Sequence, residues 1–241
     1  MVSWGLTALN IAPPSPIKCK PKPVPCPQPA PTPAPVKPAP APAPVPPKPA
    51  PAPGQTDVHY PETDNKDVNA AIKEHIDKLV EDFKARALKG DDAAGATYKL
   101  TYEGGFVNNN IVSFRFDIVE KITGDATPVH KVFTLMYDLN SGKELKNRTL
   151  FANRNYADEL SRLVREGLQD TAPFKGNEAA LELLEKGTAP KAANFENLFV
   201  QDGKLYILFA PGQISSDAEV KEFVIPVADH QELFSKDFLV R

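Results

Sequence analysis

The sequence predicts an α+β fold in which antiparallel sheets pack against helices. A long stretch of helical periodicity comes first, and three runs of alternating apolar and polar residues follow it. Two shorter helical stretches then lead into three more strand-like runs and a terminal helical turn. No strand-to-strand crossover carries a long helix of the doubly wound kind, so the expected order is α-βββ-αα-βββ-(α) with antiparallel pairing.

The first helix is expected within the segment DNKDVNAAIKEHIDKLVEDFKARALKG. Asp64 or Asn65 provides an N-cap, because either side chain accepts hydrogen bonds from the free N–H groups at a helix start, and Gly90 provides a stop. Apolar residues recur at helical spacing along this segment: Val68, Ile72, Ile76, Leu79, Val80 and Phe83. The segment is therefore predicted to be an amphipathic helix with one buried face.

Three predicted strands form a meander after this helix. The first alternates within TYKLTYEGG, the second lies within NNNIVSFRFDIVEKI, and the third, HKVFTLMYDL, ends at the turn NSGK. Residues 106–110 are expected in or beside the hairpin connection of the first two strands. These three runs are predicted to pair antiparallel in chain order.

The second half of the domain returns to helices and then to strands. Residues 155–170 carry apolar side chains at helical spacing, and residues 176–187 predict a shorter helix bounded by two glycines. Residues 194–211 predict a hairpin on the turn Asp202-Gly203. A further strand is expected in VKEFVIPV and a terminal helical turn in DHQELFSKDF.

The N-terminal segment differs in composition from the rest of the chain. Of the 26 prolines, 20 lie between Pro13 and Pro53, and residues 1–56 contain five lysines but no Asp or Glu. Frequent proline fixes φ and removes N–H donors, so we expect a stiff polyproline II stalk over residues 1–56 and a folded domain over residues 57–241. With 31 acidic against 23 basic side chains, the domain has a net charge of about −8. A division of it into residues 57–152 and 153–241 is left open.

The composition of the stalk bears on where the protein acts. It resembles the stalks with which bacterial envelope proteins span the wall or periplasm; a cytosolic disordered tail and a ligand for aromatic-groove domains are the alternatives. The opening MVSWGLTALNIAPPSP is interpreted as a signal remnant or a misannotated start. Cys19 and Cys26 are compatible with free thiols, intermolecular bridging or an internal disulfide. We expect export to the cell envelope or periplasm, with membrane attachment only through an unseen anchor.

The domain carries no sequence motif for catalysis, metal binding or nucleic-acid binding. It lacks a Gly-x-Ser-x-Gly elbow and a glycine-rich phosphate loop, and its acidic charge disfavours nucleic acid. Its histidines are scattered without the spacing of a zinc site: His59, His75, His130 and His230. We therefore expect no catalytic residue, no cofactor and no metal, which leaves a recognition module.

Two segments match motifs of a known family. The first reads YDLNSGKELKNRTLF, and its matching residues are Tyr137-Asp138-Leu139, Ser141-Gly142-Lys143, Leu145 and Leu150-Phe151. The second begins FVQDGKLYILFAP, and its matching residues are Phe199, Asp202, Gly203, Phe209, Pro211, Ile214, Ala218, Ile225 and Pro226. Over residues 60–240 the chain resembles the RsiV-like extracellular domain family, which occurs in a lysozyme-sensing anti-sigma factor and, with its preceding half, beside the catalytic domain of the peptidoglycan deacetylase PdaC.

The resemblance implies an exported domain that binds a macromolecule, with lysozyme or cell-wall glycan as the precedent. It implies a structural role for six residues: Asp138, Gly142, Phe209, Pro211, Ile214 and Pro226. It implies ligand contacts at a turn and at a loop where this chain departs from the family's residues: Gly124 and His130 in the turn, and Gly212, Gln213 and Asp217 in the loop.

The predicted function is a non-catalytic envelope binding module on a proline-rich stalk. Its expected partner is a cationic protein such as lysozyme, toward which an acidic domain is steered, or peptidoglycan. Two alternatives stay open: an enzyme acting on peptidoglycan glycan, and a structural docking protein of the envelope.

Overall fold

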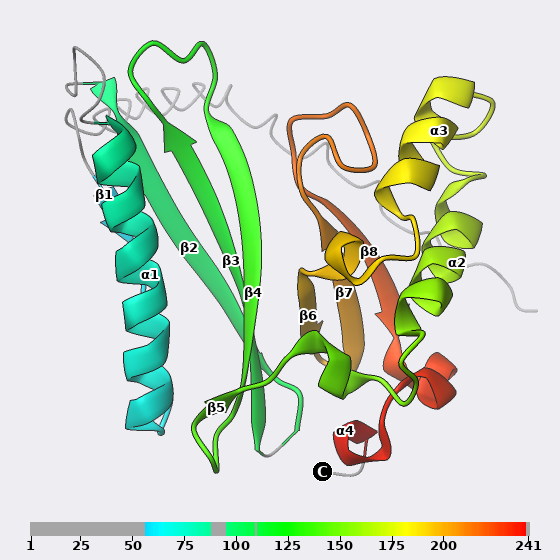
Figure 1. Cartoon of the computed structure of the whole chain (residues 1–241), viewed down its shortest axis with the longest axis horizontal. Coiled ribbons are helices and arrows are strands. Elements are labelled where there is room, and N and C mark those ends of the chain that lie inside the picture. The colour runs from blue at the N-terminus through cyan, green and yellow to red at the C-terminus, as the bar shows by residue number, and fades with distance from the viewer. Residues whose placement is uncertain (1–55, 88–94, 109, 240–241) are drawn as a thin grey trace, which may run out of the picture. The chain divides into compact units, whose positions relative to one another are not determined.

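The computed structural model describes residues 56–87, 95–108 and 110–239, and Figure 1 shows their arrangement. The predicted stalk, with Cys19 and Cys26, and the predicted helix stop at Gly90 lie outside the described residues. All described residues belong to one compact unit, Lys48–Arg241.

The first sheet is built around the predicted meander. Strands β2 (Thr97–Phe106), β3 (Ile111–Lys121) and β4 (Val129–Asp138) pair antiparallel in chain order. Phe106 and Val112 are the last register pair of the β2–β3 hairpin, so the predicted hairpin connection is confirmed. Short β5 (Lys143–Glu144) adds an antiparallel edge to β4.

One strand departs from the sequence prediction. Residues Thr56–Val58 form β1, which pairs parallel with β2, and the first helix connects the two strands. The expectation that no crossover carries a long helix is wrong at this point. Three residues, one of them an aspartate, are too few to show a strand periodicity, so β1 gave no signal in the sequence.

Helix α1 (Lys66–Ala87) covers one face of this sheet (Figure 1). Asn65 is its N-cap: the side-chain Oδ1 accepts hydrogen bonds from the N–H groups of Asp67, at 2.9 Å, and Val68, at 3.2 Å. The buried face of α1 packs with the inward side chains of β2, β3 and β4 in one hydrophobic cluster: Val68, Ile72, Ile76, Val80, Phe83, Tyr98, Leu100, Val112, Phe114, Phe116, Ile118, Leu135 and Tyr137.

The second sheet contains β6 (Leu198–Gln201), β7 (Lys204–Phe209) and β8 (Lys221–Pro226), paired antiparallel in that order. Asp202 and Gly203 have φ values of 50° and 70°, as a type I′ hairpin turn requires, so the predicted turn is confirmed. Helices α2 (Tyr156–Leu168) and α3 (Glu178–Gly187) precede this sheet. Short helical segments complete the half: η2 (Asn147–Leu150), η3 (Ala192–Phe195), η4 (Val227–Leu233) and α4 (Lys236–Leu239).

The two sheets meet through β6. The N–H of Val200 in β6 donates to the hydroxyl of Ser113 in β3, at 3.1 Å, and both residues are buried. A Cβ atom on Gly105 of β2 would lie 2.8 Å from the Gln201 side chain, so a glycine is needed for the strands to approach. The predicted α+β class, with antiparallel-rich sheets and packed helices, is confirmed. None of the helices in the described part of the chain has both the length and the apolar composition of a membrane span.

Candidate functional site

The loop between β7 and β8 is closed by its own backbone. Gly212 has φ +77°, a left-handed conformation that favours glycine, and its N–H donates to the carbonyl of Asp217 at 3.1 Å. The N–H of Gln213 donates to the carbonyl of Ala210 at 3.0 Å. These bonds fold residues 210–217 back on themselves, so the predicted ligand residues Gly212, Gln213 and Asp217 come together in one compact loop.

The Gln213 side chain fixes this loop to the helical layer. Its Oε1 accepts from the N–H of Ala210 at 3.0 Å, and its Nε2 donates to the carbonyls of Gly187 at 3.1 Å and Asn194 at 3.0 Å. The amide therefore joins the end of β7, the end of α3 and η3. In the described structure Gln213 works as a clamp, and its predicted contact with a ligand stays a prediction.

Polar side chains cluster after this clamp. Asp217 forms an ion pair with Lys221 at 2.7 Å and accepts a hydrogen bond from Ser215 at 3.3 Å. The hydrogen bond from Lys221 lowers the pKa of Asp217, and the same bond raises the pKa of Lys221. Asp217 is exposed, whereas Ser215 is buried apart from a small part of its surface. The loop thus presents a charged carboxylate on a backbone that is held by hydrogen bonds.

This loop and α3 form an open pocket with a volume of about 470 Å³. We call it the loop pocket, and its lining residues are Pro173, Asn177, Ala179, Ala180, Glu182, Leu183, Lys186, Ser215, Ser216 and Asp217. The lining combines hydroxyls, an amide and charges of both signs with apolar side chains. It contains no histidine to activate Ser215 or Ser216 as a nucleophile.

The second predicted ligand group lies in the first sheet. Gly124 has φ +96° in the turn between β3 and β4, and a side chain there would meet open space. His130 lies opposite Val119 near the start of β4 and is half-buried. No hydrogen bond or ion pair between described residues joins this turn to the loop of Gln213. No polar contact among the described residues therefore links the two predicted ligand groups.

The residues with predicted structural roles lie in framework positions. Asp138 holds the turn after β4, because its Oδ1 accepts from the N–H of Asn140 at 2.8 Å and its carbonyl accepts from Gly142, which has φ +69°. Phe209 and Ile214 are buried in the core of the second half. Pro211 follows β7, and Pro226 ends β8 ahead of η4.

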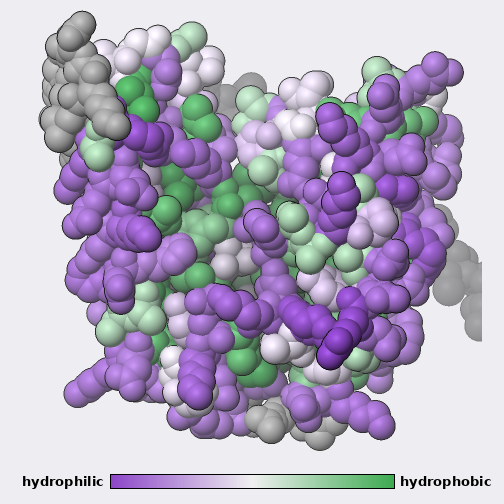
Figure 2. All heavy atoms as spheres, in the orientation of Figure 1, coloured by the Kyte–Doolittle hydropathy of each residue, from purple (hydrophilic) through white to green (hydrophobic). Residues whose placement is uncertain are grey.

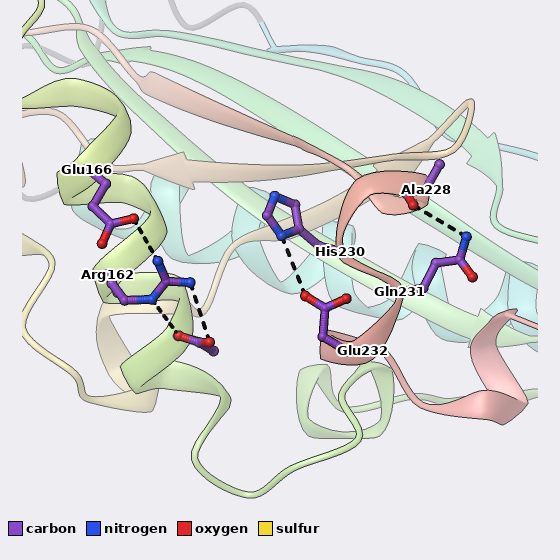
Figure 3. A network of polar contacts seen from close by, with 7 residues as sticks. Arg162, Glu166, Ala228, His230, Gln231 and Glu232 are labelled. Carbon is purple, nitrogen blue, oxygen red and sulfur yellow. Dashed lines mark hydrogen bonds and ion pairs between the residues drawn. The ribbon is translucent and has the colours of Figure 1, made fainter.

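A charged cleft of about 450 Å³ lies between the start of α2 and η4, and sequence reasoning missed it. Arg162 donates from Nε to Glu159 at 2.9 Å and from Nη1 to Glu166 at 2.6 Å. Figure 3 shows Arg162 and Glu166 side by side on α2. His230 Nδ1 lies 3.8 Å from Glu232 Oε1 (Figure 3). The spacing of Glu159, Arg162 and Glu166 on one helix was a signal for the Arg162 network, but nothing local linked it to His230.

The cleft brings carboxylates together, although its charge pattern does not fit a proton donor. A general acid for glycosides needs a raised pKa. The hydrogen bond from Arg162 instead lowers the pKa of Glu159. Within the ranges that the structure describes, no group of three or more His, Cys, Asp or Glu side chains is placed to hold a metal ion.

Part of the chain matches the model of a known family. The family described as "Protein of unknown function (DUF3298)" matches residues 148–228, which contain the whole loop pocket. No curated protein matches the chain.

Two solved structures are similar to parts of this chain. A DUF3298 family protein from Pseudomonas aeruginosa is 11% identical, with a TM-score of 0.51 over 65% of this chain and 69% of that one. A member of the family from Bacteroides fragilis is 18% identical, with a TM-score of 0.49 over 70% of this chain and 71% of that one. Residues 148–228 of this chain are thus similar to the DUF3298 family.

Proposed function

We propose that this protein is a non-catalytic binding module of the RsiV-like type, exported to the cell envelope on a proline-rich stalk. Its proposed partner is a cationic protein such as lysozyme, and its proposed binding surface is the loop pocket. The observation that carries the proposal is the clamp of Gln213, which holds residues 210–217 in position through contacts with Ala210, Gly187 and Asn194.

A loop fixed in this way suits recognition. Binding by a mobile loop costs conformational entropy when the loop becomes ordered, whereas a loop already held in its bound shape avoids that cost. Here the hydrogen bonds of Gln213 and Gly212 order the backbone, and Ser216 and Asp217 remain exposed beside α3. The exposed groups are hydrogen-bonding and charged groups of the kind that select a polar or cationic surface.

The charge of the domain supports a cationic partner. Residues 57–241 carry about −8, and an excess of one sign accelerates association with an oppositely charged protein at low ionic strength. Figure 2 shows one face of the molecule, on which hydrophilic residues dominate and hydrophobic residues are mostly confined to the middle. Binding through such a polar surface is expected to weaken as the salt concentration rises.

The test is binding of the full-length chain to lysozyme by surface plasmon resonance at about 50 and 300 mM salt. We expect the affinity to fall at least about tenfold across this range, because screening removes the attraction between the two net charges. Absence of binding at the lower salt concentration would refute the proposed partner. A pull-down with insoluble peptidoglycan in the same buffer tests the wall as the ligand instead.

Matched lysine substitutions locate the binding surface. Ser216→Lys puts a positive charge in the loop pocket, whereas Thr127→Lys puts the same charge on an exposed residue in the turn that contains Gly124. We expect Ser216→Lys to weaken lysozyme binding about tenfold or more and Thr127→Lys to change it less than about threefold. The reverse order would move the site to the turn of Gly124 and His130.

The same samples test the two alternatives. The charged cleft, with Glu159 and Glu232, is the place where an enzyme acting on glycan would find its acids, so release of soluble fragments from peptidoglycan is measured with Glu159→Gln and Glu232→Gln as controls. Turnover that both substitutions abolish would replace the binding proposal by the enzyme. Co-purification from native envelopes of a protein other than lysozyme would favour the structural docking role.

A further inference from the structure

A third pocket, here called the aromatic groove, lies beside the hairpin that connects β2 and β3 and has a volume of about 520 Å³. One wall is the segment that leads into α1, and the other is the end of β2. Its lining residues are Pro61, Glu62, Thr63, Asp64, Tyr102, Gly104, Gly105, Phe106, Val112, Phe114 and Leu139. It shares no residue with the loop pocket or the charged cleft.

Two large aromatic side chains of the groove are exposed to solvent. Phe106 is 69% exposed and Tyr102 is 39% exposed. The two side chains are four residues apart on the same face of β2, with Gly104 between them. A Cβ atom on Gly104 would lie 2.7 Å from the Phe114 ring, so this ring packs directly against Gly104 and forms the floor of a slot between Tyr102 and Phe106.

The rim of the groove is acidic. Glu62 and Asp64 are exposed on it, and the lining contains no Lys, Arg or His. Within the described part of the chain, neither carboxylate forms an ion pair. An aromatic slot beside free carboxylates attracts a cationic side chain, because the ring face and the carboxylate both favour positive charge and the rings pack against the aliphatic stem.

A similar recognition already occurs within this protein, close to the groove in sequence. Lys73 Nζ lies 5.2 Å from the centroid of the Tyr60 ring and forms an ion pair with Asp77 at 2.5 Å. Tyr60 in turn donates to Asp77 at 2.7 Å. The ammonium of Lys73 thus interacts with both an aromatic ring and a carboxylate on the surface of the domain. The aromatic groove offers the ring and the carboxylate without the cation.

We propose that the aromatic groove binds an extended peptide segment of a partner protein, with a lysine or arginine side chain in the slot between Tyr102 and Phe106 and its charged end at Glu62 and Asp64. The site is a second one, and it does not depend on the loop pocket. Charge complementarity favours a cationic peptide over the anionic stem peptides of a cell wall. A neutral sugar would gain nothing from the two carboxylates beyond hydrogen bonds.

The test measures binding of a capped, fluorescein-labelled octapeptide of alternating Lys and Ala to the full-length chain by fluorescence anisotropy. An octapeptide of alternating Glu and Ala is the matched probe. We expect the Lys peptide to bind and the Glu peptide to bind at least about tenfold more weakly. Each lysine is attracted by the carboxylates of the groove, whereas a glutamate in its place is repelled by them. Equal binding of the two probes would refute the proposal.

Protein variants then test the groove itself. Phe106→Ala is expected to weaken Lys-peptide binding about fivefold, and Glu62→Gln with Asp64→Asn about tenfold, since both contacts of the cation are reduced. The control is Val129→Ala, because Val129 is also an exposed apolar residue of the first sheet, at 45%, and lies outside the groove. A loss with Val129→Ala equal to that with Phe106→Ala would refute the site.

Two further outcomes separate this proposal from others. Ser216→Lys, which is designed to disrupt the loop pocket, should leave Lys-peptide binding unchanged, so the two sites can fail independently. A chitooligosaccharide that binds with the same dependence on Phe106, while the Lys peptide does not bind, would overturn the peptide assignment and make the groove a glycan site.

Discussion

Gly187 at the end of α3 and Gln213 in the β7–β8 loop are in direct backbone contact: the carbonyl oxygen of Gln213 occupies the position that a Cβ atom on residue 187 would need. The side-chain Nε2 of Gln213 also donates to the Gly187 carbonyl at 3.1 Å. Steric fit and hydrogen bonding therefore act at the same point. The relation explains why a helix ends on glycine beside the proposed binding loop.

Gly187→Ala is expected to destabilise the protein by about 1–3 kcal/mol, because the added methyl group displaces the Gln213 backbone. In an unobstructed helix the same substitution would stabilise by about 0.5–1 kcal/mol, so the sign of the change is diagnostic. The measurement is urea unfolding followed by circular dichroism. Glu185→Ala, on an exposed position of α3, is the control and should change stability by less than about 0.5 kcal/mol. A more stable Gly187→Ala protein would contradict the close contact.

Gln213→Ala removes three hydrogen bonds from a half-buried amide. The carbonyls of Gly187 and Asn194 and the N–H of Ala210 lose their partner, and the expected cost is about 1–3 kcal/mol. We also expect faster amide hydrogen exchange in residues 210–217, since the clamp no longer orders the loop. Gln231→Ala is the matched control, because Gln231 makes one exposed bond to the Ala228 carbonyl at 3.3 Å (Figure 3). Unchanged exchange in the loop would contradict the clamp.

Local patterns in the sequence predicted most elements of this fold. The α1 face, the three-strand meander and the Asp202-Gly203 hairpin each follow from periodicity or from a turn dipeptide, and the structure confirms all three. The cap of α1 could not be chosen from the sequence, since Asp64 and Asn65 are both good caps. The structure selects Asn65, whose amide nitrogen also donates to the Leu139 carbonyl at 2.6 Å. That contact spans 74 residues and has no local signal.

The candidate sites were harder to predict for the same reason. Gly212, Gln213 and Asp217 are close in sequence, so their common loop was expected. The partners of Gln213 are the backbone carbonyls of Gly187 and Asn194, and a backbone carbonyl carries no residue-specific mark. The aromatic groove depends on residues 61–64 approaching Tyr102 and Phe106, and only the tertiary fold brings these segments together.

Ser113→Ala tests the joint between the two sheets. Ser113 is fully buried, and its hydroxyl accepts from the Val200 N–H across the joint. Removing the hydroxyl leaves a buried N–H without an acceptor, which is expected to cost about 1–3 kcal/mol. We expect a lower unfolding midpoint in urea with an unchanged slope. A protein as stable as the parent would show that this bond contributes nothing to holding β6 against β3.

The buried carboxylate of Glu120 is expected to make the stability of the folded protein depend on pH in the acid range. Glu120 is 4% exposed as a residue, and its carboxylate accepts from Arg86 at 2.9 and 2.7 Å and from Lys131. Burial acts to raise the pKa of Glu120, but the hydrogen bonds from Arg86 and Lys131 outweigh it, so the pKa lies below the ordinary glutamate value of 4.5. A carboxyl with a lowered pKa in the folded state contributes stability above about pH 4.5, and that contribution is lost as the pH falls through the folded value.

Glu120→Gln should therefore cost about 1–3 kcal/mol at pH 7, because Arg86 and Lys131 lose their partner. The difference from the parent should shrink as the pH falls below about 4.5, because this carboxyl is protonated first in the unfolded chain and only at lower pH in the folded protein. Urea unfolding at pH 7, 5, 4 and 3 measures both effects. Glu144→Gln, at an exposed carboxylate paired with Lys146, is the control and should cost less than about 1 kcal/mol at every pH. A Glu120→Gln difference that stays constant down to pH 3 would show that this carboxylate does not couple folding to protonation.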